Sequence, residues 1–200
     1  MHVRRIETGA FAANCFFVWA DPARTLVVDP GADAEGLDAA LARAGLTPCA
    51  YLLTHGHIDH ISAVAELATR HPAPVLLHGD DAGWAFTTLN DFPPFVPILA
   101  PPAGLDADLP EGRVIEAGPL RARVVHTPGH TPGCVCFAFD AEKILVAGDT
   151  LFQGSIGRTD LPGGSAKRIR ESLAKLMTFD DAWRVLPGHG AATTIGASSR

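Results

Sequence analysis

The chain has 200 residues, and its 16 Lys and Arg against 22 Asp and Glu give a formal net charge of −6. With 47% hydrophobic and 19% charged residues it has ample material for a core, which excludes a disordered chain. The acidic balance, without any long run of Lys and Arg, argues against a nucleic-acid partner. The length favours one domain that spans residues 1–200.

No stretch of the sequence approaches 18 uninterrupted apolar residues, so we expect no membrane-spanning helix and no membrane partner. The apolar stretch 10–20 follows Arg4 and Arg5 as in a signal peptide, but a turn at Asp21-Pro22 ends it, and we interpret it as a strand. Four cysteines are too few for a disulfide scaffold, so we expect buried, reduced thiols. Together these features predict a cytoplasmic protein.

Short apolar runs alternate with helical patterns in the first half of the chain. Asp33 is expected to cap a helix that runs to about residue 44, where Gly45 ends it. A second helix is expected over 61–70, and a third begins at Asp80 or Asp81 and runs to about residue 89. The strands predicted around these helices cover residues 15–20, 25–28, 49–53 and 75–78, the first two as a hairpin.

The second half of the chain opens with a proline-rich segment. Six prolines between residues 90 and 112 predict a long surface loop without regular structure, which we expect to wall the substrate pocket. Ser165 is expected to cap a helix to about residue 177, and we expect the tail 191–200 to fray. Strands are predicted at 114–115, 120–126, 135–139, 143–147 and 183–186. The pattern indicates a layered α/β fold of two similar halves.

Three histidines and an aspartate follow the predicted strand 49–53 within six residues, as His55, His57, Asp59 and His60. Imidazole and carboxylate are ligands of zinc- and iron-type ions, and loops at strand ends are where α/β proteins build sites. In an extended turn His55 and His57 point the same way and can hold one ion. Asp59 and His60 lie half a turn further and can reach a second ion. The cluster therefore predicts a metal site.

Three further residues meet the need for additional ligands. His130 lies in the turn Thr-Pro-Gly-His-Thr-Pro-Gly, whereas Asp149 and His189 each follow a predicted strand. Each has a neighbouring glycine, which allows the backbone to come close to a site. Asp149 suits a bridging position, because one carboxylate can bind two cations.

At this point the sequence resembles the metallo-β-lactamase superfamily, through His55-x-His57-x-Asp59-His60, His130, Asp149 and His189. The resemblance implies a four-layer αββα sandwich with metals at one edge between the sheets. It also implies one metal on His55, His57 and His130, a second on Asp59, His60 and His189, and Asp149 between them. Asp29, in Val-Asp-Pro-Gly, matches an aspartate that orients ligands without binding metal.

Within the superfamily the segment 149–165 looks most like short, single-domain relatives of hydroxyacylglutathione hydrolase, or glyoxalase II. The resemblance implies two divalent metals, zinc first with iron or manganese as alternatives, and a small-molecule thioester partner that can be glutathione-linked. Glyoxalase II enzymes carry an additional C-terminal helical region that helps to hold glutathione, and we expect no such domain here. Phe152 and Arg158 are our candidates for substrate binding.

The first functional hypothesis is hydrolysis of a thioester of the S-lactoylglutathione type by a metal-bridging hydroxide. We expect Asp59 to hold the nucleophile and accept its proton. The alternative is a mononuclear-iron dioxygenase acting on glutathione persulfide, with His55, His130 and Asp149 as its ligands. A non-catalytic binding module and an RNA nuclease form a third class, against which the complete ligand set and the acidic charge argue.

Overall fold

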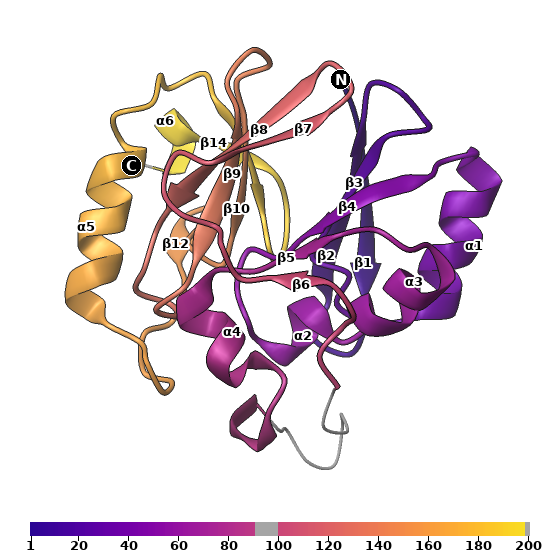
Figure 1. Cartoon of the computed structure of the whole chain (residues 1–200). Coiled ribbons are helices and arrows are strands. Elements are labelled where there is room, and N and C mark those ends of the chain that lie inside the picture. Colours follow the sequence, from indigo (N-terminus) through magenta and orange to yellow (C-terminus); the bar gives the residue numbers. More distant parts are fainter. Residues whose placement is uncertain (91–99, 199–200) are drawn as a thin grey trace.

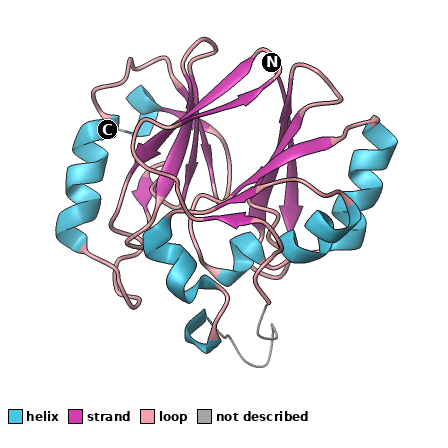
Figure 2. Cartoon of the chain, viewed as in Figure 1, coloured by secondary structure: helices cyan, strands magenta, loops and turns pink. Residues whose placement is uncertain are grey.

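Two six-stranded mixed sheets pack face to face at the centre of the computed structural model, which describes residues 1–90 and 100–198 (Figures 1 and 2). The first sheet has the order β1 (His2–Thr8), β2 (Ala13–Trp19), β3 (Thr25–Val28), β4 (Pro48–Leu52), β5 (Val75–Leu76) and β6 (Leu105–Asp106). The second has the order β14 (Thr193–Thr194), β13 (Arg184–Pro187), β10 (Ile144–Gly148), β9 (Val135–Phe139), β8 (Leu120–His126) and β7 (Val114–Ala117). A small hairpin joins β11 (Leu151–Phe152) to β12 (Ser155–Ile156).

Helices cover the outer faces of both sheets. Helices α1 (Ala34–Ala44) and α3 (Val64–Arg70) lie on the first sheet, and α5 (Ala166–Leu176) lies on the second, near the short α6 (Ile195–Ser198) (Figure 1). Helices α2 (Ile58–Ile61) and α4 (Gly79–Ala85) lie at the lower end of the molecule in this view, with the 3-10 turn η1 (Thr88–Asn90) after α4. No helix of the described residues is both long and apolar enough to cross a membrane.

The core is divided into three apolar clusters, one for each interface between four layers. Phe17 packs with α1 and α3 on one face of the first sheet, whereas its neighbour Phe16 packs with Phe137 between the two sheets. Leu145 and Leu176 belong to the third cluster, under α5. Adjacent residues of β2 thus serve opposite interfaces, as the two-residue period of a strand requires. This arrangement confirms the expected αββα sandwich.

Several local predictions are confirmed. The Asp33 side chain accepts a hydrogen bond from the Gly36 N–H at the start of α1, and Gly45 ends that helix. Ser165 caps α5 through the N–H of Arg168. These helices match because their start and stop signals lie within one turn of their ends.

Other predictions are wrong in detail. The expected helix 61–70 is two helices, because the chain turns at Ala63, whose N–H bonds to the Pro30 carbonyl. The described part of the tail, 191–198, does not fray as expected, since β14 pairs with β13 and Ile195 is buried. Within the proline-rich segment β6 pairs with β5, and residues 91–99 of that segment lie outside the described residues. The sequence analysis also missed β1, whose partner is β2.

Candidate metal centre

Loops at one end of the sandwich bring together all seven side chains that the sequence suggests as metal ligands. The first sheet supplies four of them through the loop after β4 and the helix α2, and the second sheet supplies three through the loops after β8, β10 and β13. The seven are His55, His57, Asp59, His60, His130, Asp149 and His189. Neither sheet alone contains the set. Their role as metal ligands stays a prediction.

Backbone carbonyls fix two of the imidazoles from the second sheet. His130 donates from Nδ1 to the carbonyl of Arg158 at 2.8 Å, and His189 donates from Nδ1 to the carbonyl of Phe11 at 3.1 Å. A carbonyl can only accept, so each Nδ1 carries the proton and each Nε2 is left with a free lone pair. Hydrogen bonds of this kind set the tautomer of metal-binding histidines.

Asp29 fixes two imidazoles from the first sheet in the same way. Its carboxylate accepts from Nδ1 of His60 at 3.1 Å and from the hydroxyl of Thr54 at 2.7 Å. Because the Thr54 hydroxyl donates to Asp29, it can accept from Nδ1 of His55, which lies 3.0 Å away. The Nε2 atoms of His55 and His60 are therefore also left with free lone pairs.

The imidazole nitrogens described above face one another across the site, and their short separations indicate whether the site suits a cation. Nε2 of His130 lies 2.8 Å from Nδ1 of His57, and Nε2 of His60 lies 3.2 Å from Nε2 of His189. The buried Nε2 of His55 and Oδ1 of Asp149 have no hydrogen-bond partner. Buried acceptors that face one another are costly unless a proton or a cation lies between them. The donor set therefore fits divalent metal ions.

Asp29 itself does not belong to this donor set, although it lies close to His55 and His60. Both of its oxygens are already used, since Oδ1 accepts the Thr54 N–H at 2.7 Å and Oδ2 accepts from Thr54 and His60. Its backbone adopts a positive φ of 48°, an uncommon conformation for a residue other than glycine. Asp29 thus has the orienting position that the sequence suggested.

The electrostatics divide the histidines into two groups. Burial and the neighbouring His130 lower the pKa of His57 to about 3, and burial lowers that of His55 well below its ordinary value. Burial opposes charge on His60 too, but the carboxylates of Asp149 and Asp59 raise its pKa to about 10. The acidic groups therefore favour positive charge at His60, where a cation can take the place of the proton.

Glycines allow the strand ends to approach closely. A Cβ atom on Gly188 would lie 2.1 Å from Oδ1 of Asp149 and 2.8 Å from the His60 ring. Gly148 has a φ of 48°, and a Cβ there would lie 2.4 Å from the Thr54 hydroxyl. Any larger residue at these positions would push the two sheets apart at the site.

A cavity of about 640 Å³ opens beside the cluster. Its polar floor includes His57, Asp59 and His189. Arg158 lies in its wall, and the role of this residue in substrate binding stays a prediction. Phe152 lies against the His189 ring, with 6.3 Å between ring centres, and is not among the described residues that line the cavity.

The sequence analysis missed one buried carboxylate that braces the site. We expected Asp80 or Asp81 to cap α4, but His78 is the cap residue, and Asp81 is fully buried and turned inward. Asp81 accepts hydrogen bonds from the N–H of Gly56 at 2.9 Å and from the N–H of Gly133 at 2.8 Å. It also accepts from the hydroxyl of Thr131 at 2.6 Å. One side chain thus joins the loop of His55 and His57 to the loop of His130.

Comparisons with known proteins find similarity along nearly the whole chain. The model of the family described as "Metallo-beta-lactamase superfamily" matches residues 8–189. The probable metallo-hydrolase YqgX of Bacillus subtilis is 36% identical, over 98% of this chain and 93% of its own. The hydroxyacylglutathione hydrolase GloC of Haemophilus influenzae is 34% identical, over 100% of this chain and 96% of its own.

Solved structures are similar over the same range. The BLEG-1 B3 metallo-beta-lactamase superimposes with a TM-score of 0.88 at 36% identity, covering 98% of this chain and 95% of the other. TTHA1623, solved in a di-iron-bound form, has a TM-score of 0.87 at 35% identity, covering 99% and 98%.

Proposed function

We propose that this chain, which belongs to the metallo-beta-lactamase superfamily, hydrolyses thioesters of the S-lactoylglutathione type. The superfamily and the similarity to YqgX make it a metallo-hydrolase. The observation that carries the proposal is the convergence of five imidazoles and two carboxylates beside a cavity. The resemblance to a hydroxyacylglutathione hydrolase over the whole chain supports the choice of a thioester.

The donor set supports two metal positions. His55, His57 and His130 would hold one ion, because their ligand atoms lie within 4.8 Å of one another. The second ion would be held by Asp59, His60 and His189, which meet the same criterion. Asp149 would lie between them, since its two oxygens approach His60 at 3.5 Å and His130 at 3.6 Å. We favour zinc; the di-iron form of TTHA1623 makes iron the first alternative.

A bound divalent cation supplies Lewis acidity and lowers the pKa of water that it coordinates. We expect Asp59 to accept the proton of the attacking water, and its carboxylate, which lines the cavity and is 21% exposed, is accessible to that water. Burial disfavours its charge, but the attraction to His60 and the hydrogen bond from His189 hold the pKa of Asp59 well below its ordinary value, so the carboxylate is ionised at neutral pH.

In the proposed reaction the water oxygen bonds to the acyl carbon and the carbon–sulfur bond breaks. The sulfur leaves with the bonding electrons and takes up the proton, so one thioester and one water give one carboxylic acid and one thiol. A thiolate is a good leaving group, which removes the need for a strong general acid. This agrees with a cavity whose titratable groups are mostly those proposed to hold metal.

The test is metal analysis of the purified protein, paired with hydrolysis of S-lactoylglutathione by the wild type and Asp59→Asn. We expect about two metals per chain and a loss of at least ~100-fold in kcat in the variant. Asp108→Asn, at a site that is 86% exposed, is the matched control and should keep wild-type turnover. One iron per chain, with oxygen uptake on glutathione persulfide and no thioester hydrolysis, would instead establish the dioxygenase.

A second candidate reaction is opening of a β-lactam ring, because the structure of BLEG-1, named a B3 metallo-beta-lactamase, is 36% identical over almost the whole chain. Both reactions are attacks of water on an activated carbonyl. Hydrolysis of nitrocefin by the metal-loaded protein, compared with hydrolysis of S-lactoylglutathione, separates the two. A higher kcat/KM for nitrocefin would make the β-lactam the better substrate.

A further inference from the structure

The wall of the cavity is apolar beside the polar floor. Five side chains form this apolar wall: Phe11, Ile58, Trp84, Leu89 and Leu161. Leu89 is 79% exposed and Phe11 is 43% exposed, so two large apolar side chains face solvent next to the proposed centre. Such side chains at a pocket commonly mark a surface that a ligand covers.

Trp84 is an aromatic part of the apolar wall that lies against one of the proposed metal ligands. Its ring lies 5.7 Å from the ring of His57, centre to centre, at an interplanar angle of 61°. It follows Asp81 by three residues on α4, so the carboxylate that anchors the histidine loops also fixes the helix that carries it. At the end of η1, Asn90 donates to the carbonyls of Gly56 and Ala85. The wall near His57 is therefore held in place at both ends.

Cations are scarce around this cavity. Arg158 is the one Lys or Arg among the described residues that line it, and it forms two hydrogen bonds to Asp160, at 2.8 and 2.7 Å. Arg158 holds the pKa of Asp160 at about 2, so the pair is ionised on both sides and without net charge at neutral pH. A glutathione group brings two carboxylates and one ammonium, and the described lining of the cavity offers those carboxylates no cation other than Arg158, whose charge Asp160 balances.

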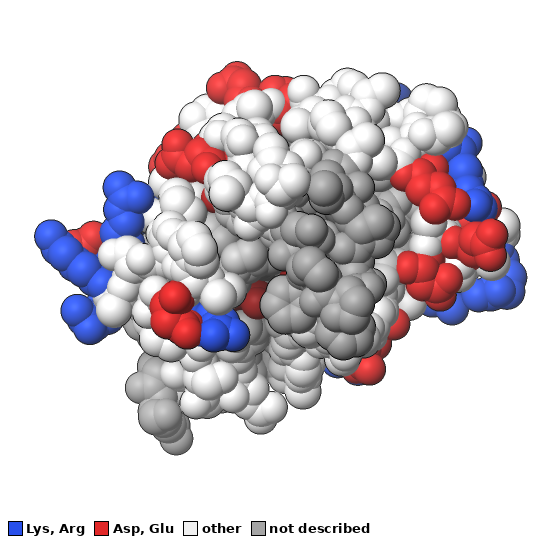
Figure 3. Space-filling model, turned by 90° about the horizontal axis from the view of Figure 1, so that it is seen from below, with Lys and Arg blue, Asp and Glu red and all other residues white. Residues whose placement is uncertain are grey.

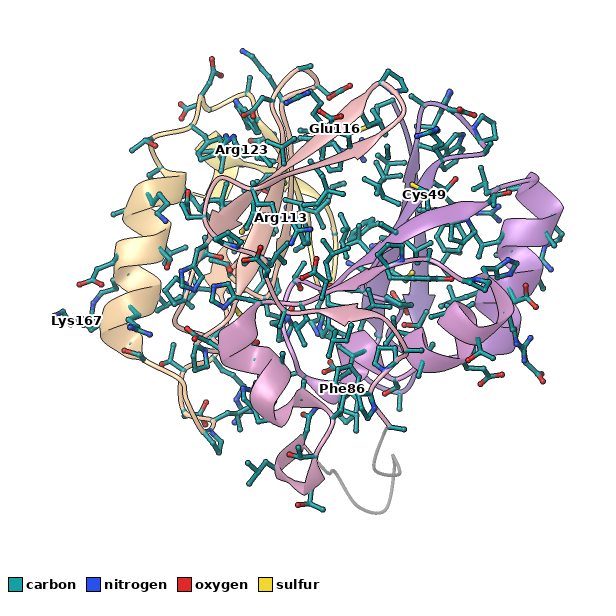
Figure 4. The ribbon with its side chains drawn as sticks, viewed as in Figure 1. Cys49, Phe86, Arg113, Glu116, Arg123 and Lys167 are labelled. Carbon is teal, nitrogen blue, oxygen red and sulfur yellow. The ribbon has the colours of Figure 1, made fainter. Side chains whose placement is uncertain are left out.

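The rest of the chain does not supply the missing cations. The sequence has no Lys or Arg between Arg70 and Arg113, a range that includes α4 and η1. Lys167, the next cation after Arg158, lies on α5 and points outward, away from α4 (Figure 4). Seen from below, most Lys and Arg side chains lie toward the two sides of that face (Figure 3).

We infer that this site prefers a thioester in which the acyl chain or the thiol is apolar and uncharged over a thioester of glutathione. The inference rests on the proposed thioester hydrolysis and keeps the bond that is cleaved, but it puts an apolar group in the place of glutathione in the preferred substrate. Contact with Trp84, Ile58 and Leu161 would supply the binding energy, because burial of apolar surface is favourable and needs no paired charge. The apolar group can be on the acyl side or on the thiol side, which the experiment distinguishes.

The experiment compares matched thioesters on the metal-loaded protein. One pair keeps the acetyl group and changes the thiol, from benzyl mercaptan to glutathione. The other pair keeps N-acetylcysteamine and changes the acyl group, from hexanoyl to acetyl. We expect kcat/KM to be at least ~10-fold higher for the apolar member of one pair, and that pair identifies the apolar side. A kcat/KM for S-acetylglutathione that equals or exceeds the kcat/KM of both apolar thioesters would overturn the inference.

Two variants test whether the apolar wall causes the preference for apolar thioesters. In Trp84→Ala the kcat/KM values of the apolar and the polar thioester should differ by no more than about threefold, because the variant removes a large apolar surface next to His57. Trp19→Ala, whose ring stacks on His2 at 5.3 Å and does not line the cavity, is the matched control and should keep the preference. A preference that survives Trp84→Ala would refute the assignment.

Binding separates this inference from the proposed reaction. Calorimetry on the metal-loaded protein compares two thioethers that cannot be hydrolysed, S-benzyl-N-acetylcysteamine and S-methylglutathione. Binding of the benzyl thioether at least ~10-fold more tightly supports the inference even if no thioester is turned over, in which case the proposed hydrolysis alone fails. Tighter binding of S-methylglutathione, lost in Arg158→Gln, overturns the inference and leaves the hydrolysis intact.

Discussion

Asp81→Asn should weaken the fold and metal binding together, because one buried carboxylate holds both histidine loops. The side chain is fully buried and accepts hydrogen bonds from Gly56, Thr131 and Gly133. Asparagine has the same shape but only one accepting oxygen. Whichever way the amide turns, its NH₂ group faces a backbone N–H, that of Gly56 or that of Gly133.

The magnitude follows from these contacts. A hydrogen bond to a charged group contributes about 1.5–3 kcal/mol, and an unpaired buried donor costs about 1–3 kcal/mol. Burial raises the pKa of Asp81, so the carboxylate carries a desolvation cost that the amide avoids, and this offsets part of the loss. We expect a net decrease of roughly 2–3 kcal/mol in the free energy of unfolding of the metal-free protein. Loss of such an outer contact typically lowers metal affinity about 10-fold or more.

Two measurements on each variant test this reasoning: urea unfolding after treatment with chelator, and metal affinity by competition with a chromophoric chelator. Tyr51→Phe is the control, because it removes a buried hydroxyl that bonds to the Leu67 and His71 carbonyls, away from the site. That variant should lose about 1 kcal/mol of stability and keep its metal affinity. The reasoning is refuted if Asp81→Asn binds metal as tightly as the wild type, or if Tyr51→Phe loses as much affinity.

Three further predictions concern the whole chain. Removal of metal by chelator should lower the urea midpoint, because each ion bound only by the folded state adds about 4 kcal/mol at a thousandfold excess over Kd. Maleimide should modify Cys49 before Cys15, Cys134 and Cys136 in the folded protein, because those three thiols are buried and burial raises the pKa of each; mass spectrometry of the labelled peptides measures the order. The pKa of Asp38 is lowered first by the hydrogen bond from His71 and then by that from Arg70. The ionised Asp38 therefore stabilises the folded state at pH values above the ordinary pKa of an aspartate, and this stabilisation is lost as the pH falls through the lowered pKa of the folded state. Acid unfolding of His71→Ala, followed by circular dichroism, should therefore occur at a higher pH than that of the wild type.

The sequence predicted those elements whose signals are local. Helix α1 begins and ends where Asp33 and Gly45 indicate, because a cap acts within one turn. Strand β1 was missed because it is an edge strand with few buried residues, and its order comes from its pairing with β2. The ordered tail was missed for the same kind of reason, since the N–H of Ile195 bonds to the Trp183 carbonyl across the fold.

In the candidate site, too, the sequence predicted some features and missed others. Residue type and position at strand ends were enough to collect seven metal-type side chains from two sheets. Apart from Asp29, the groups that orient them were not predicted, because they come from distant parts of the chain and two of them are backbone carbonyls. The carbonyls of Arg158 and Phe11 fix the tautomers of His130 and His189, and no residue type marks a carbonyl for this role. Asp81 was read as a helix cap because a carboxylate at a helix start usually has that role.

The division of the site between the two sheets has an energetic consequence. Metal held by His57 from the first sheet and His130 from the second would join loops that the inter-sheet core already brings within 2.8 Å. Binding of metal and packing of the sheets therefore stabilise the same arrangement, and each strengthens the other by the same free energy. Gly188 and Gly148 allow that close approach at the cost of side-chain packing, and the proposed ions would supply the cross-link that no side chain at those positions can make. His60 and His189 also come from different sheets, and their Nε2 atoms lie 3.2 Å apart, so an ion held by both would add to the packing of the sheets in the same way.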